Sequence, residues 1–544
     1  MAKKKKSRKS NRIGQPQSSP SRRFSGTPLL VFENPSGAVT KLLIVLQLLL
    51  LAYQFTPQLS TNGDNAVYYF LGKSLAKGTG YRNICLVNKP IESTYPVLTP
   101  LFISLSQFFA PTPLLPKILM AFLGALVTLM CYYLFKSYLS FQLLTPLLLL
   151  TAASGLMADY QLILMSETPY LLLTLCALFA RCKSIEAPEN RIFFWIALTL
   201  SVLPVHARSI GIVFSAAWIT DELLQKRYKS AILHALLVGT TILLFRSLVP
   251  DSSAYANSPF LKNAYDPEMG YITFHDLKTR IITNIKVHLT TLFPRSFIPF
   301  TSSKPGAFQM FVAAGMMIAS FVGWFFCFRR TARIFSIYVL FYTGLICIWP
   351  IANDRRICPL MPFLLFFFIT GLTIILRIPL LPEKRFVSTL KKLSAGFNRL
   401  HLTKAKYGIL WICVAIIFTM NVHYRIRNPL SPRHGTPDWK NFYSCADWIR
   451  NNTPENSVIV NRKPELFYLR SHRAGCMYLY SHDVDKIIQD MKRKNVTHVV
   501  YDNFAWTRTT AKYLYPVIAS HPELFDVVYA LKNPDTFVLA FRNK

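Results

Sequence analysis

Apolar runs long enough to cross a lipid bilayer recur along the first three quarters of the chain. A spanning α-helix needs about 20 apolar residues, because the hydrocarbon core is about 30 Å thick. About eleven runs are expected to span the membrane when charged residues are taken as their boundaries, although the third to sixth are short. They lie at residues 40–56, 115–136, 140–156, 166–181, 191–205, 208–223, 231–249, 307–328, 334–351, 357–376 and 407–422. The sequence therefore predicts a polytopic α-helical membrane protein.

The composition agrees with a membrane protein. Of the 544 residues, 52% are hydrophobic and 16% are charged, whereas about 25% of a soluble domain is charged. The formal net charge of +35 is also typical of nucleic-acid-binding proteins. However, the basic residues gather in the N-terminal tail and in alternate loops, which is the pattern that orients spanning helices. We therefore expect no nucleic-acid partner, and a disordered cytosolic tail over residues 1–38 that contacts membrane lipids.

The alternation of loops assigns a side of the membrane to each polar segment. With the N-terminus in the cytosol, the membrane domain covers residues 39–423 and its basic loop at 377–406 is cytosolic. The loops at 57–114 and 250–306 are then outside. Because the expected number of spans is odd, residues 424–544 lie on the same outer side as these two loops.

Residues 424–544 have the composition of a soluble domain. Segments rich in β-branched and aromatic residues predict strands, and amphipathic segments between them predict helices. The strands are expected at 457–461, 497–502, 525–531 and 536–541, and the helices at 438–452 and 483–495. This alternation predicts a small extracytoplasmic α/β domain, which we expect to be accessory because it has no glycine-rich phosphate loop. Cys445 and Cys476 are candidates for a disulfide there, although sequence does not fix pairing.

The first outer loop begins with an unusual polar sequence, NGDNAVYYFLGKSLAKGTG at residues 62–80. An acid before the apolar stretch and a glycine after it predict a short helix over about 65–77, along the membrane surface. Asp64 is then either a helix cap or a catalytic base at the bilayer edge. Further along, Lys89-Pro90 and Tyr95-Pro96 predict a rigid irregular path. That path either points Lys89 at a phosphate or leaves a solvated lysine at the interface.

Three further sites lie at the outer ends of predicted spans. Glu167 opens one span, where an acid either caps the helix or is a functional group at membrane depth, and Asp159 is a weaker alternative in the same loop. Arg208 and the pair Arg355-Arg356 face outward, against the positive-inside trend. Arginine suits bidentate phosphate recognition, and snorkelling toward lipid head groups is the alternative. Together these groups suit transfer from a phosphate-activated donor: cations hold the leaving phosphate and a carboxylate deprotonates an incoming hydroxyl.

These segments, in this order, resemble the multispanning GT-C glycosyltransferases. The first loop, from Asp64 through Gly78-x-Gly80-Tyr81 to Tyr95-Pro96, resembles that of the protein-mannosyltransferase and aminoarabinose-transferase-like group, commonly found in bacteria. The resemblance extends over nearly the whole chain except the basic tail and residues 250–306. It includes MSETPYLLL (165–173), HARSIG (206–211), the R-x-x-x-P-L-x-P-F pattern at 355–363 and WIRNNTPENSVIVNRKPELFYL (448–469).

The resemblance implies a GT-C fold, a polyprenyl-phosphate sugar donor and an inverting, single-displacement transfer outside the cytosol. By the resemblance, Asp64 is the catalytic base and Glu167 is the acid of the second loop. The residues expected to bind the substrate or its phosphate are Lys89, Tyr68, Tyr95, Arg208, Arg355 and Arg356. Several relatives have an acidic pair at the first site, but Asn65 follows Asp64 here. A divalent metal is therefore not predicted from these residues, and no cofactor is assigned.

The sequence thus predicts a membrane glycosyltransferase, in the plasma membrane if the protein is bacterial, acting on an unidentified lipid, glycan or protein acceptor. A transporter or flippase of lipid-linked substrates is an alternative, which would place ionisable residues inside helices and show inverted repeats. A membrane scaffold that presents the C-terminal domain is another, which would not require the acids of the outer loops.

Overall fold

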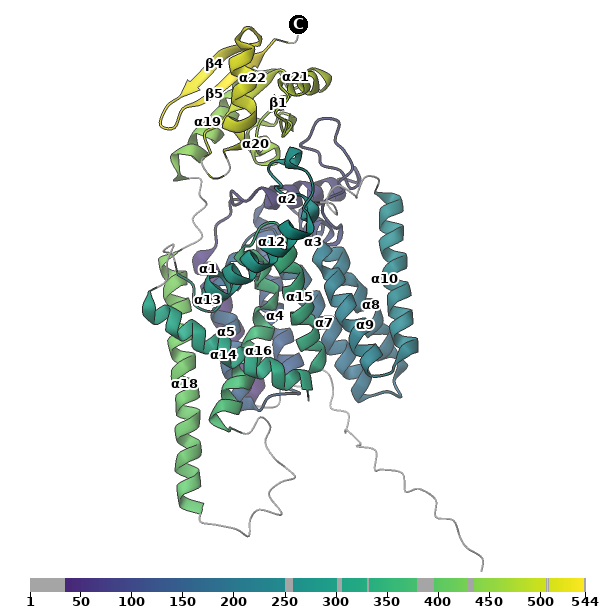
Figure 1. Cartoon of the computed structure of the whole chain (residues 1–544), viewed down its shortest axis with the longest axis vertical. Helices are drawn as coiled ribbons and strands as arrows, with labels where there is room; N and C mark the ends of the chain where they lie inside the picture. The colour runs from purple at the N-terminus through teal and green to yellow at the C-terminus, as the bar shows by residue number, and fades with distance from the viewer. Residues whose placement is uncertain are drawn as a thin grey trace, which may run out of the picture.

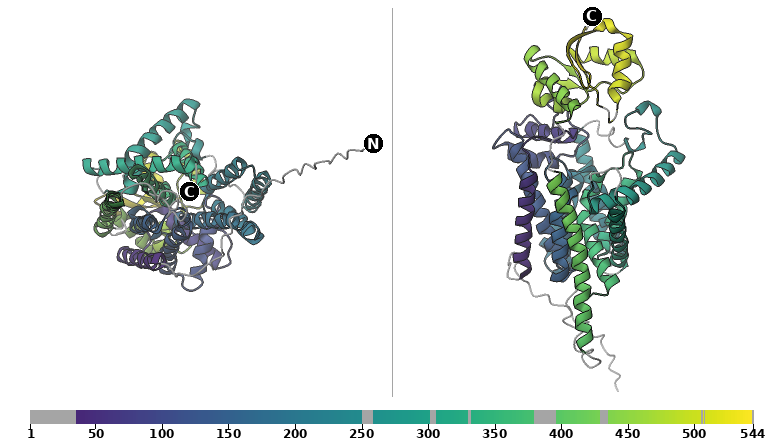
Figure 2. Two further views of the ribbon diagram at one scale, coloured as in Figure 1. Left: turned by 90° about the horizontal axis from the view of Figure 1, so that it is seen from below. Right: turned by 90° about the vertical axis from the view of Figure 1, so that its left-hand side faces the viewer.

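The structure is a computed structural model that describes residues 35–249, 258–300, 306–329, 332–378, 396–428, 435–504, 506 and 508–542. It is a long bundle of α-helices with a small sheet-containing domain at one end, here called the domain end (Figure 1). Figure 2 shows the same arrangement from the side. The basic tail and most of the basic loop at 377–406 lie outside the described residues.

Each predicted apolar run coincides with a helix, except that 140–156 corresponds to the pair α5 and α6, bent by 53°. Six of the described helices are long and apolar enough to span a membrane, and the bent pair gives a possible seventh. The protein is therefore a mostly helical integral membrane protein. The bundle helices are α1 (Pro35–Gln54), α4 (Leu114–Phe135), α5 (Phe141–Ala153), α6 (Gly155–Gln161), α7 (Glu167–Glu186), α8 (Arg191–Ala207), α9 (Ile212–Leu224), α10 (Tyr228–Leu248), α14 (Ala307–Arg329), α15 (Arg333–Ile348), α16 (Met361–Leu376) and α18 (Gly396–Arg427).

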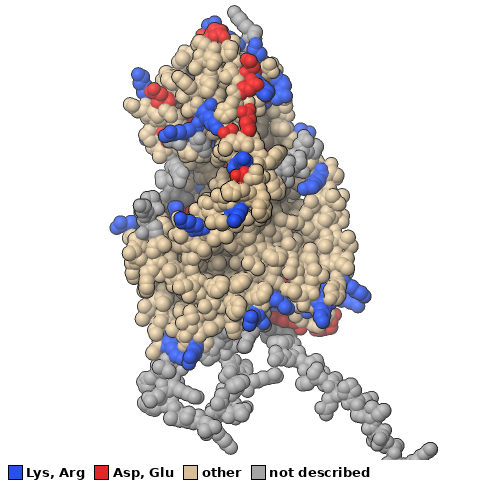
Figure 3. Space-filling model, in the orientation of Figure 1, with Lys and Arg blue, Asp and Glu red and all other residues tan. Residues whose placement is uncertain are grey.

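The surface of the bundle agrees with insertion in a bilayer. In Figure 3 a broad tan band, almost free of charged side chains, crosses the middle of the bundle, and charges gather at both ends. Large apolar side chains are exposed on this surface, among them Leu243 on α10 and Phe321 on α14. Such contiguous apolar exposure marks a membrane-facing surface.

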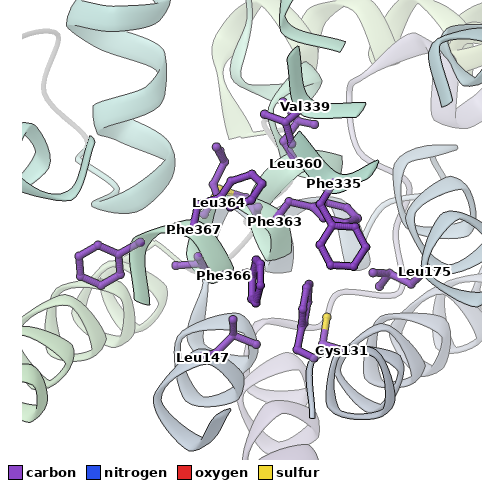
Figure 4. Close-up of a cluster of buried hydrophobic side chains, with 14 of the residues drawn as sticks. Cys131, Leu147, Leu175, Phe335, Val339, Leu360, Phe363, Leu364, Phe366 and Phe367 are labelled. Atoms are coloured by element: carbon purple, nitrogen blue, oxygen red, sulfur yellow. The ribbon is translucent and has the colours of Figure 1, made fainter. Parts of the chain in front are cut away.

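Close backbone approach and aromatic packing hold the bundle together. A Cβ atom on Gly323 would lie 1.9 Å from the carbonyl oxygen of Phe367, so α14 and α16 touch where only glycine fits. Small residues at such crossings are typical of membrane helices, whose association has no hydrophobic driving force. Beside this contact, Phe335 of α15 packs at 5.7 Å and 5.8 Å from Phe363 and Phe366 of α16 (Figure 4).

The segment 250–306, which the sequence predicts as a long loop, contains helices among its described residues. They are α12 (Phe274–Val287), the π-helical turn η4 (His288–Leu292) and α13 (Phe293–Phe297). Thr273 and Asp276 form a capping box that starts α12, which is a local signal that the sequence does carry. Asn284 then donates to the carbonyls of Cys347 and Trp349, both at 2.8 Å, and so ties α12 to the domain end of α15.

The C-terminal domain has a five-stranded mixed sheet in the order β2-β1-β3-β5-β4. The strands are β1 (Ile459–Val460), β2 (Gly475–Cys476), β3 (His498–Tyr501), β4 (Phe525–Leu531) and β5 (Thr536–Phe541), and the helices are α19 (Pro437–Asn452), α20 (Pro464–Ser471), α21 (Val484–Arg493) and α22 (Tyr515–Ser520). All four predicted strands and both predicted helices are present, whereas α20, β2 and α22 were not predicted. Cys445 and Cys476 are unpaired thiols buried in different hydrophobic clusters, so no disulfide joins them.

The segment at 57–114 contributes α2 (Gly63–Ala76) and α3 (Leu98–Gln107), and it docks directly on the C-terminal domain. The Gly475 N–H of β2 donates to the Cys85 carbonyl at 2.9 Å, and the Val87 N–H donates to the Gly475 carbonyl at 3.1 Å. Phe70 of α2 packs edge-on against Tyr468 of α20 with ring centroids 5.3 Å apart. The sheet domain is therefore fixed against the loop that carries Asp64.

Candidate active site

A cavity of about 710 Å³ lies among the domain ends of the bundle helices. Segments from six distant parts of the chain meet around it, and they bring four arginines, one carboxylate and a set of apolar side chains. The lining residues are Asp64, Tyr68, Ser93, Thr94, Tyr95, Pro96, Ser166, Val205, His206, Arg208, Ser209, Ile210, Ile212, Ile242, Phe245, Arg246, Pro259, Tyr265, Leu345, Trp349, Ile351, Arg355 and Arg356. This combination of apolar wall and convergent polar groups is typical of a substrate site.

Asp64 lies in the first turn of α2, but its carboxylate does not cap the helix. The helix begins after Asn62, and no side-chain hydrogen bond caps it. Instead, Asp64 Oδ1 accepts a hydrogen bond from the Tyr95 hydroxyl at 2.8 Å, and Oδ2 accepts one from Arg355 Nη1 at 2.5 Å. The capping interpretation of Asp64 is therefore wrong, and the carboxylate is directed at the cavity wall.

Arg355 also connects Asp64 to the acid of the second loop. It belongs to the short turn η5 (Asp354–Arg356), and its Nε atom donates to Glu167 Oε1 at the start of α7. Arg208, just before the turn η1 (Ser209–Gly211), forms a second ion pair with the same Glu167 oxygen. Glu167 is completely buried. Two carboxylates and two guanidinium groups thus form a continuous, balanced network, as buried charges require.

The surroundings of Asp64 keep it ionised. Burial raises the pKa of the Asp64 carboxyl, but the charge of Arg355, hydrogen bonds from Arg355 and Tyr95, and the charge of Lys463 outweigh burial and hold that pKa below its usual value. Burial and the neighbouring Asp64 charge hold the pKa of Tyr95 well above its usual range, so its hydroxyl stays a donor. A carboxylate of this kind can accept a proton from a nearby hydroxyl.

Comparison with known proteins gives a match in fold. No protein-family model matches the chain, and no curated protein matches it in sequence. The solved structure of ArnT from Cupriavidus metallidurans in the apo state matches with a TM-score of 0.58 at 12% identity, over 94% of this chain and 99% of that one. ArnT bound to undecaprenyl phosphate matches over the same shares with a TM-score of 0.56 at 10% identity. The Archaeoglobus fulgidus oligosaccharyltransferase matches with a TM-score of 0.53 at 11% identity, over 92% of this chain and 73% of that one.

These matching structures are GT-C glycosyltransferases. The chain has the GT-C fold. The superfamily resemblance found in the sequence is thereby confirmed at the level of fold.

Within this GT-C fold, most of the predicted site residues come together. Asp64, Tyr68, Tyr95, Arg208, Arg355 and Arg356 all line the cavity, and Glu167 lies directly behind its two arginines. The Tyr68 and Tyr95 rings pack edge to face at 5.0 Å. Arg356 lies over the Trp349 ring at 4.7 Å and donates to the Ile351 carbonyl.

Lys89 is the exception among the predicted site residues. It is an exposed residue in a turn, with φ of 44°, and its carbonyl accepts a hydrogen bond from Arg82 at 3.2 Å. It does not line the cavity. The position fits the interpretation of Lys89 as a solvated lysine, and the prediction that it binds phosphate is not supported by its placement.

Asp159, the weaker alternative to Glu167, also lies elsewhere. It accepts a hydrogen bond from Tyr424 of α18 at 3.3 Å. Tyr424 lines a separate cavity that is formed largely by residues of α18, and Asp64 and its partners take no part in that cavity.

Three residues at the candidate site were missed by the sequence-based predictions. Arg246 is in the last turn of α10, and Tyr265 lies between α10 and α12. Both residues line the cavity. Lys463 of the C-terminal domain lies near Asp64. Only the segment NRKPELFYL, which is part of the family resemblance, gave a signal for Lys463. In the described ranges no three His, Cys, Asp or Glu side chains gather as metal ligands do.

Proposed function

We propose that the protein is a membrane glycosyltransferase that moves a sugar from a polyprenyl-phosphate donor to an acceptor hydroxyl. The observation that carries the proposal is the ion pair between Asp64 and Arg355 in the wall of a cavity with three further arginines. A carboxylate beside phosphate-binding cations is what transfer from a glycosyl phosphate requires. The GT-C fold of the chain supports the same activity.

The reaction would be a single displacement. The acceptor oxygen forms a bond to the anomeric carbon while the bond from that carbon to the phosphate oxygen breaks, with inversion at the carbon. Asp64 accepts the acceptor's proton, and the polyprenyl phosphate leaves with the bonding electron pair. Because the leaving group carries the negative charge, cations placed around its oxygens lower the barrier.

The four arginines of the cavity differ in the partners that hold them, and so in how they would bind the donor phosphate. Arg208 and Arg355 are anchored by Glu167, which fixes their guanidinium groups at the cavity wall. Arg356 and Arg246 also line the cavity. When the donor phosphate binds, it would compete with Asp64 for Arg355, and the carboxylate would be released to act on the acceptor hydroxyl.

The apolar part of the wall suits the lipid of the donor. Ile210, Ile212, Ile242, Phe245 and Leu345 lie on the side formed by η1, α9, α10 and α15. Ile212 is 43% exposed, so this wall is open to the surroundings of the bundle. The ArnT structure that contains undecaprenyl phosphate supports a lipid of this class.

The proposed topology follows the positive-inside rule. About eleven helices would span the membrane, with the N-terminus in the cytosol and the site and the C-terminal domain outside. In a bacterium the membrane would be the plasma membrane, and the domain division would fall near residues 39 and 424.

Asp64→Asn tests the proposal. Mass spectrometry of envelope lipids and glycans from cells with and without the gene would first show which sugar unit is lost. Mass spectrometry would then follow the consumption of a panel of polyprenyl-phosphate sugars by the purified protein in nanodiscs. We expect Asp64→Asn to reduce transfer by roughly 10²–10⁴-fold, the usual contribution of a positioned base. Asp447→Asn, which alters an exposed ion pair with Arg470, is the matched control. Full transfer by Asp64→Asn would contradict the proposal.

A further inference from the structure

Lys463 brings a cation from the C-terminal domain to the start of α2. It immediately precedes α20, and its Nζ atom lies 3.0 Å from the place that a Cβ atom on Gly63 would occupy. Gly63 is the residue before Asp64 and the first residue of α2. The lysine tip therefore lies beside the first turn of α2, which carries the proposed base, and Lys463 is not one of the residues that line the cavity.

The protein holds this lysine in place with several contacts. Its backbone N–H donates to Asn461 Oδ1 at 3.0 Å, and its ammonium group lies over the Trp506 ring at 5.2 Å. The neighbouring Arg462 is buried and lies over the same ring at 4.0 Å. Burial lowers the pKa of Lys463, and the charge of Asp64 opposes that effect. Burying a cation is unfavourable unless something compensates it, so its position is not that of a solvated surface lysine.

The interface beneath Lys463 is rigid. Asn83 of the first outer loop donates to Glu465 Oε1 of α20 at 3.0 Å. Together with the Phe70–Tyr468 contact and the backbone bonds to Gly475, this fixes α20 against α2. The distance between Lys463 and Asp64 is thus set by the docking of the C-terminal domain.

We propose that Lys463 is a positioning residue of the reaction, which keeps Asp64 ionised and oriented while Arg355 is engaged by the donor phosphate. The inference rests on the proposed function of Asp64. It also changes the role of the C-terminal domain, which the sequence predicted to be accessory: the domain completes the electrostatic surroundings of the active site.

The charged groups around Asp64 and Lys463 determine how a substitution at either residue changes the electrostatic surroundings of the other. Arg355 of η5, Tyr95 of the first outer loop and Lys463 face Asp64, and Glu167 lies beyond Arg355. Asp64, Arg462, Glu465 and Asp502 surround Lys463. When the donor draws Arg355 away, Lys463 is the cation that still faces Asp64.

Removal of the Lys463 charge tests the proposal through the pH profile of transfer. In Lys463→Met, we expect the acidic limb of the kcat profile, which reports the enzyme with donor bound, to move to higher pH, with roughly three- to tenfold lower transfer on the acidic side and a smaller change at neutral pH. Lys463→Arg keeps the positive charge, so its acidic limb should lie at the wild-type pH. Lys486→Met on α21, an exposed lysine paired with Asp483, is the control.

Gly63→Ala offers a second route that leaves the lysine in the chain. The new methyl group would lie 3.0 Å from Lys463 Nζ, the far end of a flexible side chain, and would push it aside by a few tenths of an ångström at little cost to the fold. We expect Gly63→Ala to shift the limb in the same direction as Lys463→Met, by a smaller amount. In the double variant the two shifts should not add, because no lysine remains to be displaced.

The outcomes separate this inference from the proposed function. If Asp64→Asn abolishes transfer while Lys463→Met, at unchanged thermal stability, keeps the wild-type pH profile, the role of Lys463 is wrong and the proposed function stands. If Lys463→Arg fails to restore the limb, the lysine acts through packing and the inference is also wrong. If Asp64→Asn is fully active, both proposals fail.

Discussion

Arg355 Nη1 lies 2.5 Å from Asp64 Oδ2, although 291 positions separate the two residues in the chain. The same guanidinium reaches Glu167 through its Nε atom. Arg355 therefore joins the two carboxylates that the sequence singled out. Because Arg355 also lines the cavity, a donor phosphate bound there could compete with Asp64 for its guanidinium group. The pair is the centre of the proposed chemistry.

Arg355→Lys should remove this bridge. A lysine has one ammonium group and no planar fork, so it cannot donate to Asp64 and Glu167 in the same geometry. We expect transfer to fall roughly 10²–10³-fold, as when a preorganised donor is lost. Steady-state transfer assays in nanodiscs would measure this, with Arg470→Lys at the exposed pair with Asp447 as the control. Near-normal transfer by Arg355→Lys would show that its bridging geometry is dispensable.

Glu167→Gln should act mainly on stability. Glu167 is fully buried and compensates Arg208 and Arg355, so its neutralisation leaves two guanidinium groups short of a counter-charge. We expect a loss of about 3–5 kcal/mol in the free energy of unfolding. Thermal or denaturant unfolding in detergent would measure it. Glu186→Gln, at a partly exposed pair with Lys183, should change stability by less than about 1 kcal/mol. Equal stability of the two variants would exclude a compensating role for Glu167.

Tyr95→Phe should change the pH dependence of transfer. The Tyr95 hydroxyl donates to Asp64, and its removal lets the pKa of Asp64 rise toward the usual value. Because the base acts when ionised, the acidic limb of kcat/KM should move to higher pH. Tyr69→Phe is the control, since its hydroxyl donates to the Pro111 carbonyl at 2.7 Å and it does not line the cavity. An unchanged limb in Tyr95→Phe would argue against Asp64 as the titrating base.

Asp502 predicts a pH-dependent stability of the C-terminal domain. Burial raises the pKa of Asp502 to about 6, with Arg462 opposing the shift, whereas an unfolded aspartate titrates near pH 3.9, an approximate reference value. The folded domain therefore binds this proton more tightly. Its contribution to stability is fully present below about pH 4 and is lost as the pH rises through about 6.

Proteolysis and thermal unfolding of the full chain in detergent, between about pH 5 and 8, would test this linkage. Wild-type protein should become more resistant as the pH falls across that range, and Asp502→Asn should lack this component. A wild-type profile in Asp502→Asn would assign the titration to another group.

Gly371→Ala should disrupt the crossing of α14 and α16. A Cβ atom there would lie 1.7 Å from the Ala319 carbonyl oxygen, so the helices must separate. We expect a destabilisation of at least about 1–3 kcal/mol, the usual range for overpacking. Gly344→Ala on α15, where no atom lies within 4 Å of the added methyl group, is the matched control. Thermal unfolding in detergent would compare them, and equal midpoints would contradict the packing shown by the structure.

Local patterns in the sequence were sufficient for most of the helices and strands but not for the contacts between them. The strands at 525–531 and 536–541 were predicted with their observed bounds, because β-branched runs between turn residues are local signals. The helices within 250–306 were missed, since α12 is amphipathic rather than apolar and only its capping box marks it. Lys89 was predicted from its place beside Pro90 in the first loop and from the family resemblance, whereas Lys463 was missed because it is near Asp64 only after the C-terminal domain has docked.

The sequence by itself determined that the chain is a helical membrane protein, where most of its helices lie and which side chains are candidates for chemistry. Hydrophobic length and charge bias act along the chain, so they can be read without the fold. Only the tertiary structure decided that Asp64 is paired with Arg355 rather than capping α2, that Glu167 anchors two arginines, and that Lys463 lies beside Gly63. Those relationships depend on distances of a few ångströms between groups that are far apart in the chain. Only the packing of the helices and the docking of the C-terminal domain set such distances.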